Sequence, residues 1–120
     1  MKKFLVICML LIGTVTFAQN KNAKATIEVD GVCNMCKERI EKAAIRAIGV
    51  KMANWDVNTH DLQLIYDERI TDLNKIQQSI ADIGHDTKDI KATDEAYHSL
   101  HDCCLYRDEV VRDDHKTDKQ

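Results

Sequence analysis

The stretch 24-KATIEVDGVCNMCKERIEKAAIRAIG-49 joins a strand pattern, a pair of cysteines and a helix pattern. The residues at 25, 27 and 29 are apolar and alternate with polar ones, and this period of two is typical of a half-buried β-strand. Positions 40, 43, 44, 47 and 48 carry only Ile or Ala, which is the spacing of a helix with one buried face. Gly49 is the expected end of that helix. The pair Cys33 and Cys36 is therefore predicted to lie where a strand passes into a helix.

The residues that follow repeat the same kind of unit. Two strands are predicted over residues 50–57 and 61–67, with a turn at 58–60. A second helix is predicted to be capped by Thr71 or Asp72 and to end at Gly84, and its apolar side carries Leu73, Ile76, Ile80 and Ile83. Residues 85–92 give a weaker strand prediction, because Ile90 is their only large apolar residue. The order β-α-β-β-α-β predicts an α+β fold, in which two helices cover one face of a four-stranded antiparallel sheet of order 4-1-3-2.

The first 18 residues have the pattern of a secretory signal peptide. Two lysines precede an apolar stretch, and small residues at 16 and 18 favour cleavage between Ala18 and Gln19. The alternative is a membrane anchor, but the apolar stretch of about 14 residues is shorter than the roughly 20 that a spanning helix needs. We therefore expect a soluble periplasmic or secreted protein. Its parts would be a signal peptide (1–18), a folded domain (19–92) and a C-terminal tail (93–120).

Charge and composition exclude several classes of function. Removing residues 1–18 takes away two lysines and no acidic residue, so the formal net charge falls from −3 to −5. A chain of this charge is not expected to bind nucleic acid. The sequence has no glycine-rich phosphate loop and no serine or acid pair in a catalytic motif, so we expect no enzymatic activity. Cys8 would be lost with the signal peptide, which leaves four cysteines at positions 33, 36, 103 and 104.

The pair Cys33 and Cys36 has three possible roles. A helix N-terminus stabilises thiolate, the form of cysteine that binds metals and attacks disulfides, and Lys37 and Arg39 add positive charge nearby. Two thiolates suit a soft ion such as Cu(I), Hg(II), Zn(II) or Cd(II). A redox dithiol would use the same activation, but thioredoxin-like proteins place a cis-proline beside the pair and this chain has no proline. A structural disulfide to the tail is the third possibility.

Residues 24 to about 92 resemble the heavy-metal-associated domain, the module of copper chaperones, metal-transporting P-type ATPases and the periplasmic mercuric-ion binding protein. The resemblance is carried by Gly31 with the cysteine pair, by "GVKMANWDVNTHDLQLIYD" (49–67) and by "DLNKIQQSIADIGHD" (72–86). It implies a ferredoxin-like fold and a metal, with Cu(I) first, held by Cys33 and Cys36 and passed to a metal-transporting membrane protein or efflux component.

The loop departs from the family pattern, which reads Gly-Met-x-Cys-x-x-Cys. Here the sequence is Gly-Val-Cys-Asn-Met-Cys, one residue shorter, with Val32 or Met35 in place of the usual methionine. In the predicted sheet the fourth strand starts next to the end of the first strand. His85 would then lie beside the cysteines, as a third ligand or as a hydrogen-bond partner of the thiolates.

The tail contains "HSLHDCC", with His98, His101, Cys103 and Cys104 within seven residues. On a short helix His98, His101 and Cys104 would share a face, because they are spaced three residues apart. Together with Cys103 they predict a second metal locus. Adjacent cysteines bridge each other only with strain, so a disulfide to Cys33 or Cys36 is the competing prediction. An extended chain from Ala92 is long enough to return to the first pair. The sequence leaves open whether the chain has one composite site or two separate ones.

Overall fold

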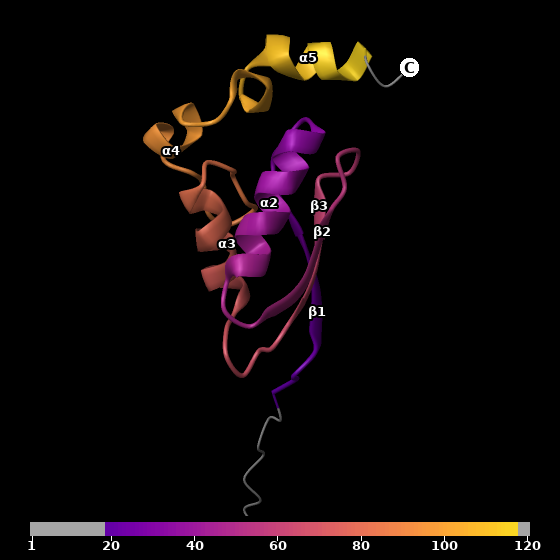
Figure 1. Ribbon diagram of the computed structural model, residues 1–120, viewed down its shortest axis with the longest axis vertical. Coiled ribbons are helices and arrows are strands. Elements are labelled where there is room, and N and C mark those ends of the chain that lie inside the picture. The colour runs from indigo at the N-terminus through magenta and orange to yellow at the C-terminus, as the bar shows by residue number, and fades with distance from the viewer. Residues whose placement is uncertain (1–18, 118–120) are drawn as a thin grey trace, which may run out of the picture.

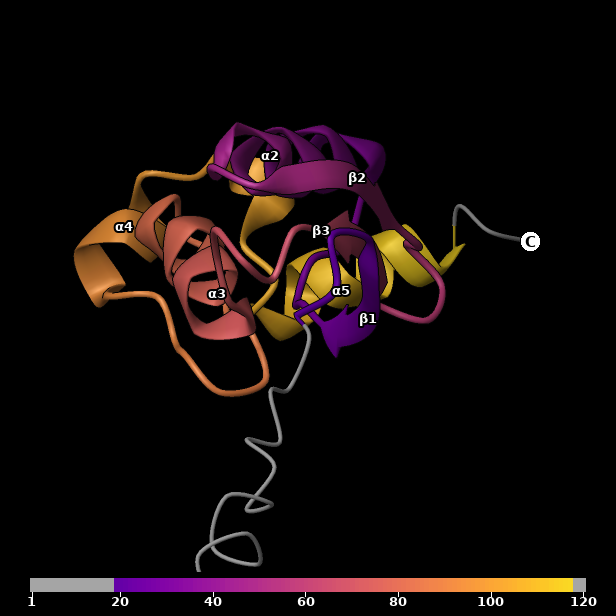
Figure 2. The same ribbon diagram turned by 90° about the horizontal axis from the view of Figure 1, so that it is seen from below.

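The computed structural model describes residues 19–117 of the chain, and the predicted signal peptide lies outside this range. The described elements are β1 (Ala23–Glu28), α2 (Asn34–Arg46), β2 (Val50–Trp55), β3 (Asp61–Tyr66), α3 (Leu73–Asp82), α4 (Asp94–His98), a 3-10 turn (Asp102–Cys104) and α5 (Glu109–Thr117). The strands form an antiparallel sheet of order β1-β3-β2. The helices α2 and α3 both cover one face of this sheet (Figures 1 and 2). No helix within residues 19–117 is both long and apolar enough to cross a bilayer.

The strand patterns of the sequence are confirmed by the register and burial of the sheet. Ile27 lies opposite Leu62, and Ala25 lies opposite Leu64. The apolar positions of β1 and β3 point into the core, whereas Lys24, Thr26 and Glu28 on the other face of β1 are exposed. Trp55 at the end of β2 is fully buried, and its indole N–H donates to the carbonyl of Val29 at 3.0 Å. This hydrogen bond ties β2 to the residues just before the cysteine loop.

The helices begin and end close to the predicted positions. Asp72 caps α3, since its side chain accepts a hydrogen bond from the backbone N–H of Lys75 at 2.8 Å. Gly84 follows α3 with a positive φ of 107°, which an L-residue adopts only with strain. Helix α2 ends at Arg46, three residues before the predicted end at Gly49. Because the chain is already extended at Ala47, Ile48 turns outward and is 80% exposed, so its predicted place on the buried face is wrong.

The predicted fourth strand is wrong, because residues 85–92 form no strand and make only a single bridge, between Thr87 and Val29, the residue after β1. Two hydrogen bonds flank it, from the N–H of Asp30 to Asp86 and from the N–H of Lys88 to Glu28. The segment then closes on itself, because the N–H of Thr87 donates to the carbonyl of Ile90 and the Thr87 side chain bonds the same residue. This turn takes the chain away from the sheet edge before a ladder can form.

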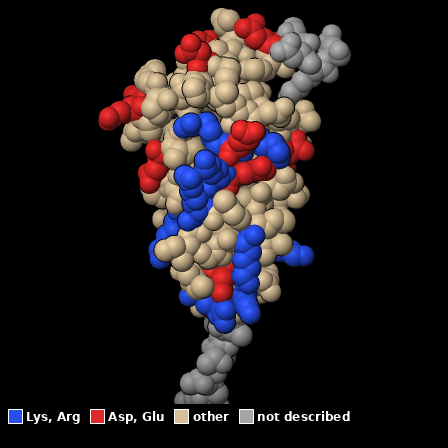
Figure 3. Space-filling model, in the orientation of Figure 1, with Lys and Arg blue, Asp and Glu red and all other residues tan. Residues whose placement is uncertain are grey.

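The tail packs on the end of the domain that carries the cysteine loop, where it also begins, because the N–H of Ala92 bonds to the side chain of Asp86. Figure 1 shows the segment from α4 to α5 passing over the N-terminal end of α2. Four tail side chains belong to the same hydrophobic core as the sheet and helices: Tyr97, Leu100, Cys104 and Tyr106. On the face shown in Figure 3, acidic side chains gather at this end of the molecule, and basic side chains gather over the middle of the helical layer. The tail is thus part of the packed structure.

Candidate metal centre

The loop between β1 and α2 holds the first cysteine pair at the start of a helix. Cys33 is the N-cap of α2 in an extended conformation, and its carbonyl accepts from the N–H of Lys37 at 3.0 Å. Cys36 lies in the first turn and is fully buried, whereas Cys33 is half-buried. Their Sγ atoms are 3.3 Å apart as free thiols. The structure therefore places two free thiols side by side at the N-terminus of α2, at the strand-to-helix junction where the sequence predicts them.

Gly31 is needed in this loop because two side chains pack directly against it. A Cβ atom at this position would lie 3.0 Å from the Cβ of Cys36 and 3.0 Å from the indole ring of Trp55. Val32 is buried beneath the loop, and Met35 is 41% exposed. Of the two residues considered as substitutes for the family methionine, Val32 therefore has the buried position and Met35 faces outward.

The positive charges near the loop are directed away from the thiols. The Lys37 ammonium donates to Glu41 at 2.9 Å and to the carbonyl of Trp55 at 2.6 Å. The Arg39 guanidinium donates to the carbonyl of Ile83 at 3.2 Å. The prediction that these two side chains add positive charge beside the cysteines is therefore not supported by their hydrogen bonds. The backbone of the first turn of α2 remains to favour the thiolate.

The thiols differ in how readily they ionise. Burial raises the pKa of Cys33, but hydrogen bonds from the backbone N–H of Cys36 and from the neighbouring thiols lower it by more. The pKa of Cys33 therefore lies below the usual value. Burial raises the pKa of Cys36 and of Cys104. Of these three thiols, Cys33 is the one that a soft ion or a disulfide would meet first as thiolate.

The tail brings a second cysteine pair to the first. The Sγ of Cys104 is 3.6 Å from the Sγ of Cys33 and 4.0 Å from that of Cys103, and Cys104 is fully buried. The three sulfur atoms of Cys33, Cys103 and Cys104 all lie within 4.8 Å of one another. The Sγ of Cys103 also lies 3.7 Å from the thioether sulfur of Met35. Residues about 70 positions apart in the sequence thus bring their sulfur atoms together in one group.

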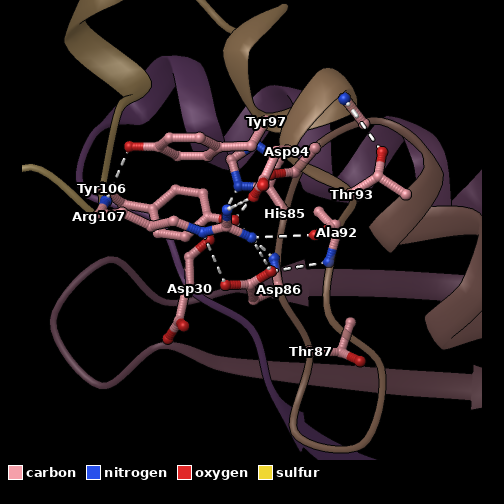
Figure 4. A network of polar contacts seen from close by, with 12 residues as sticks. Asp30, His85, Asp86, Thr87, Ala92, Thr93, Asp94, Tyr97, Tyr106 and Arg107 are labelled. Atoms are coloured by element: carbon pink, nitrogen blue, oxygen red, sulfur yellow. Dashed lines mark hydrogen bonds and ion pairs between the residues drawn. The ribbon is translucent and has the colours of Figure 1, made fainter.

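Two residues that follow the cysteines fasten the tail to the domain (Figure 4). The Tyr106 hydroxyl donates to the carbonyl of Gly84 at 2.7 Å and accepts from the N–H of Asp86 at 2.9 Å. The Arg107 guanidinium makes two hydrogen bonds to the Asp86 carboxylate, at 2.8 and 3.2 Å. Burial raises the pKa of Asp86, but the bonds from Arg107 and from the N–H of Ala92 lower it more, so that its pKa lies below the usual value.

Further contacts of Arg107 hold the start of the tail in place. Its Nη2 atom donates to the carbonyl of Ala92 at 3.0 Å, and its guanidinium lies 4.3 Å from the centre of the Tyr97 ring. The Tyr97 hydroxyl accepts from the backbone N–H of Arg107 at 3.1 Å. We call Asp86, Tyr97, Tyr106 and Arg107 the tail anchor. Because none of these residues offers a thiol, the anchor positions Cys103 and Cys104 without help from a metal.

His85 lies at the predicted end of the sheet but inside the protein. Its ring is fully buried, stacks on Tyr106 at 5.5 Å between ring centres, and places Nδ1 2.8 Å from the carbonyl oxygen of Asp30. Its Nε2 atom is buried and has no hydrogen-bond partner within the described residues. Burial lowers the pKa of His85 to about 4. His85 therefore supports the anchor residue Tyr106, and its role as a metal ligand stays a prediction.

The tail histidines lie apart from the sulfur atoms. His98 and His101 are exposed, and His98 packs edge-on against Tyr97 at 5.1 Å. Within residues 19–117, the group of possible metal ligands that includes tail residues consists of Cys33, Cys103 and Cys104. Sequence reasoning missed His115, whose Nε2 atom is 3.0 Å from the carbonyl of Cys103 and which lines a groove with Cys33 and Cys103. It also missed the tail anchor, although aromatic residues in an otherwise charged segment were a signal of packing.

Comparison with known proteins confirms the resemblance seen in the sequence. The heavy-metal-associated domain model matches residues 26–86, a little more than half of the chain. The chain is 30% identical over 63 residues to the copper chaperone CopZ of Staphylococcus haemolyticus (strain JCSC1435), and the match covers 52% of this chain and 93% of that protein.

Two solved structures show the same fold. Oxidized MerP from Ralstonia metallidurans CH34 superposes with a TM-score of 0.54 at 24% identity, covering 56% of this chain and 94% of MerP. The water-soluble region of the P-type ATPase CopA from Bacillus subtilis gives a TM-score of 0.52 at 30% identity, covering 59% of this chain and 47% of that one. The matched region in each case takes in little more than half of this chain. By its sequence and its fold, this protein belongs to the heavy-metal-associated domain family.

Proposed function

We propose that this protein is an exported carrier of soft metal ions, with Cu(I) as its first cargo, and that Cys33 and Cys36 bind the ion. The observation that carries the proposal is the pair of free thiols at the N-terminus of α2, with Sγ atoms 3.3 Å apart and Cys33 half-exposed. Thiolates are the ligands that Cu(I) prefers. A copper chaperone among the relatives supports the choice of metal, and MerP among the structures supports soft ions more widely.

The same relatives suggest what the carrier would meet. Solved structures with this fold include the N-terminal domain of a potential copper-translocating P-type ATPase and the water-soluble region of the P-type ATPase CopA, both from Bacillus subtilis. We propose that the partner is a metal-transporting membrane protein. Residues 1–18 would direct export to the periplasm or the medium and would be removed before Gln19. The mass of the mature protein recovered from the producing cell tests this part directly, because retention of the first 18 residues would contradict it.

The central test is a Cu(I) competition titration on fully reduced protein. We expect Cys33→Ser and Cys36→Ser each to weaken Cu(I) binding by more than about 100-fold, the upper end of what loss of an outer-shell partner causes. Asn34→Ser is the matched control, because it introduces the same side chain at an exposed position of the same loop. A cysteine variant that retains parental affinity would overturn the assignment.

A thiol-redox protein is the second candidate. The lowered pKa of Cys33 and the short distance to Cys36 would also suit a dithiol that exchanges with disulfides. The two functions differ in a measurable way. A carrier needs the pair reduced in its compartment, whereas an oxidant needs a pair that cycles, so the reduction potential of the pair measured beside the Cu(I) affinity separates them.

His98 and His101 remain predicted ligands of the tail. Their exposure and their distance from the cysteine group give them no preformed partner within the described residues. A metal titration of the variant in which both are alanine tests the prediction, since an unchanged number of bound ions and unchanged affinities would remove the histidines from the site.

A further inference from the structure

The four cysteines of the mature chain lie together at one end of the molecule. The sulfur atoms form a series in which Cys36 and Cys33 are 3.3 Å apart, Cys33 and Cys104 are 3.6 Å apart, and Cys104 and Cys103 are 4.0 Å apart. None of these distances is that of a disulfide, which is close to 2 Å, and all four thiols are free. The two pairs are therefore close enough to bind the same metal ion, and no disulfide joins them.

These spacings match those of thiolates around a single tetrahedral ion. A Zn–S bond of about 2.3 Å places the sulfur atoms at the corners of a tetrahedron whose edges are about 3.8 Å long. The three measured spacings lie on both sides of that value and differ from it by half an ångström or less. Cys33, Cys103 and Cys104 already have their sulfur atoms within 4.8 Å of one another, and Cys36 is connected to this group by its 3.3 Å spacing to Cys33. A four-thiolate site therefore requires Cys36 and the tail pair to move closer to each other.

The tail holds this arrangement through contacts that are independent of a metal. Tyr106 and Arg107 lie two and three residues after Cys104 and bond to Gly84 and Asp86 of the domain. Cys104 itself is fully buried in the hydrophobic core. Because these groups already fix the tail, binding an ion would require little additional ordering of the chain. Cys33 and Cys103 border a groove that they share with His115, which gives an ion a route to the sulfur atoms.

We propose that Cys103 and Cys104 join Cys33 and Cys36 as ligands of one metal ion, so that the chain has a single composite thiolate site in place of two separate loci. Each thiol that binds releases its proton to solvent. A site of this kind takes divalent d¹⁰ ions with four-coordinate preference, Zn(II) and Cd(II), in addition to Cu(I). The inference rests on the proposed function for Cys33 and Cys36 and adds the tail pair to it.

A Cd(II) titration of the reduced full-length protein tests the proposal, because the ultraviolet charge-transfer absorbance of bound Cd(II) grows with the number of thiolates. The parent should bind one ion per chain. The variant Cys103→Ser/Cys104→Ser should bind with about half the absorbance per ion and at least about 100-fold lower affinity, because two of the four thiolates that contact the ion are lost. The variant Asp102→Ser is the control, because it introduces the same side chain at an exposed position beside the tail pair, and it should match the parent. Parental absorbance and affinity in the double serine variant would overturn the proposal.

A two-locus chain would give a different pattern. The parent would then bind two Cd(II) ions, and Cys33→Ser/Cys36→Ser would keep one of them with unchanged affinity, which also overturns the proposal. The proposed function fails separately, namely if Cys33→Ser/Cys36→Ser still binds Cu(I) tightly. If that variant loses Cu(I) while the tail variant behaves as the parent, only the composite site is wrong.

A measurement on the unaltered protein guards against a variant that fails to fold. Pulse alkylation with mass spectrometry follows Cys103, the half-buried member of the tail pair. One equivalent of Cd(II) should slow the alkylation of Cys103 together with that of Cys33, by at least tenfold for each. If one equivalent slows only Cys33, Cys103 is not a ligand and the composite site is refuted.

Discussion

Replacing Arg107 by methionine would release the tail from the domain while keeping a side chain of similar length. The substitution removes two hydrogen bonds to the Asp86 carboxylate, one to the carbonyl of Ala92, and the contact with the Tyr97 ring. A hydrogen bond to a charged group contributes about 1.5–3 kcal/mol when buried, and the Arg107 side chain is 31% exposed, so solvent reduces the sum. The Asp86 side chain, 10% exposed, is left with its charge poorly paired. We expect the free energy of unfolding to fall by about 2–3 kcal/mol.

Urea unfolding of the reduced, metal-free protein measures this loss. Arg112→Met is the matched control, because the Arg112 side chain forms an exposed ion pair with Glu109 at 3.7 Å. Its removal should change stability by less than about 0.5 kcal/mol. Alkylation of the fully buried Cys104 gives a second readout. If the tail opens more easily by 2–3 kcal/mol, this thiol should react roughly 30- to 150-fold faster. Equal losses of stability in the two variants, or an unchanged rate at Cys104, would refute the reasoning that Arg107 anchors the tail.

Three further predictions follow from buried groups. The pKa of His85 is lowered from 6.5 to about 4 in the folded state, so the unfolded chain binds a proton at higher pH than the folded one. The contribution of neutral His85 to the free energy of unfolding is therefore complete above pH 6.5 and is lost as the pH falls toward 4. Between pH 7 and 4.5 this loss should be about 2–3 kcal/mol by equilibrium unfolding, and a variant His85→Gln whose pH profile is as steep as the parent's would contradict it. Gly84→Ala should lower the free energy of unfolding by about 2 kcal/mol or more, because φ is +107° and the added Cβ would lie 2.6 Å from the carbonyl oxygen of Ala96. A change below about 0.5 kcal/mol in urea unfolding would contradict this, since it would show that α4 moves aside at little cost. Truncation after Ala92 should lower stability by at least about 3 kcal/mol, because it removes four buried side chains from the core, and a thermal midpoint equal to the parent's would show that the domain folds without its tail.

The local pattern of the sequence predicted most of the domain correctly. Alternation in β1 and β3 identified the buried faces, and the spacing of Ile40 and Ala44 identified the face of α2 that packs on the sheet. These signals are local, because burial on one side of an element repeats with the period of that element. The position of Cys33 and Cys36 at the junction of strand and helix followed from the same patterns.

Features that depend on contacts between distant residues were not predictable in the same way. The turn from Thr87 to Ile90 ends the predicted fourth strand through hydrogen bonds between a side chain and the backbone, which leave no periodic signal. The end of α2 at Arg46 moves Ile48 off the buried face. In the tail, chain length showed that a return to the first cysteines was feasible, but only the pairing of Arg107 with Asp86 shows where the tail docks.

The unequal burial of the four cysteines has a consequence for the order of ligand exchange. Cys33 and Cys103 are half-buried along the groove, whereas Cys36 and Cys104 have no exposed surface. If the four cysteines share an ion as proposed, an acceptor thiolate that attacks the ion from the groove would displace the two accessible cysteines first and the two buried ones last. The ion would stay coordinated at each step, so transfer would proceed through intermediates in which cysteines of both proteins bind it. The time that the ion stays on the carrier would then depend on how fast the two buried sulfur atoms dissociate.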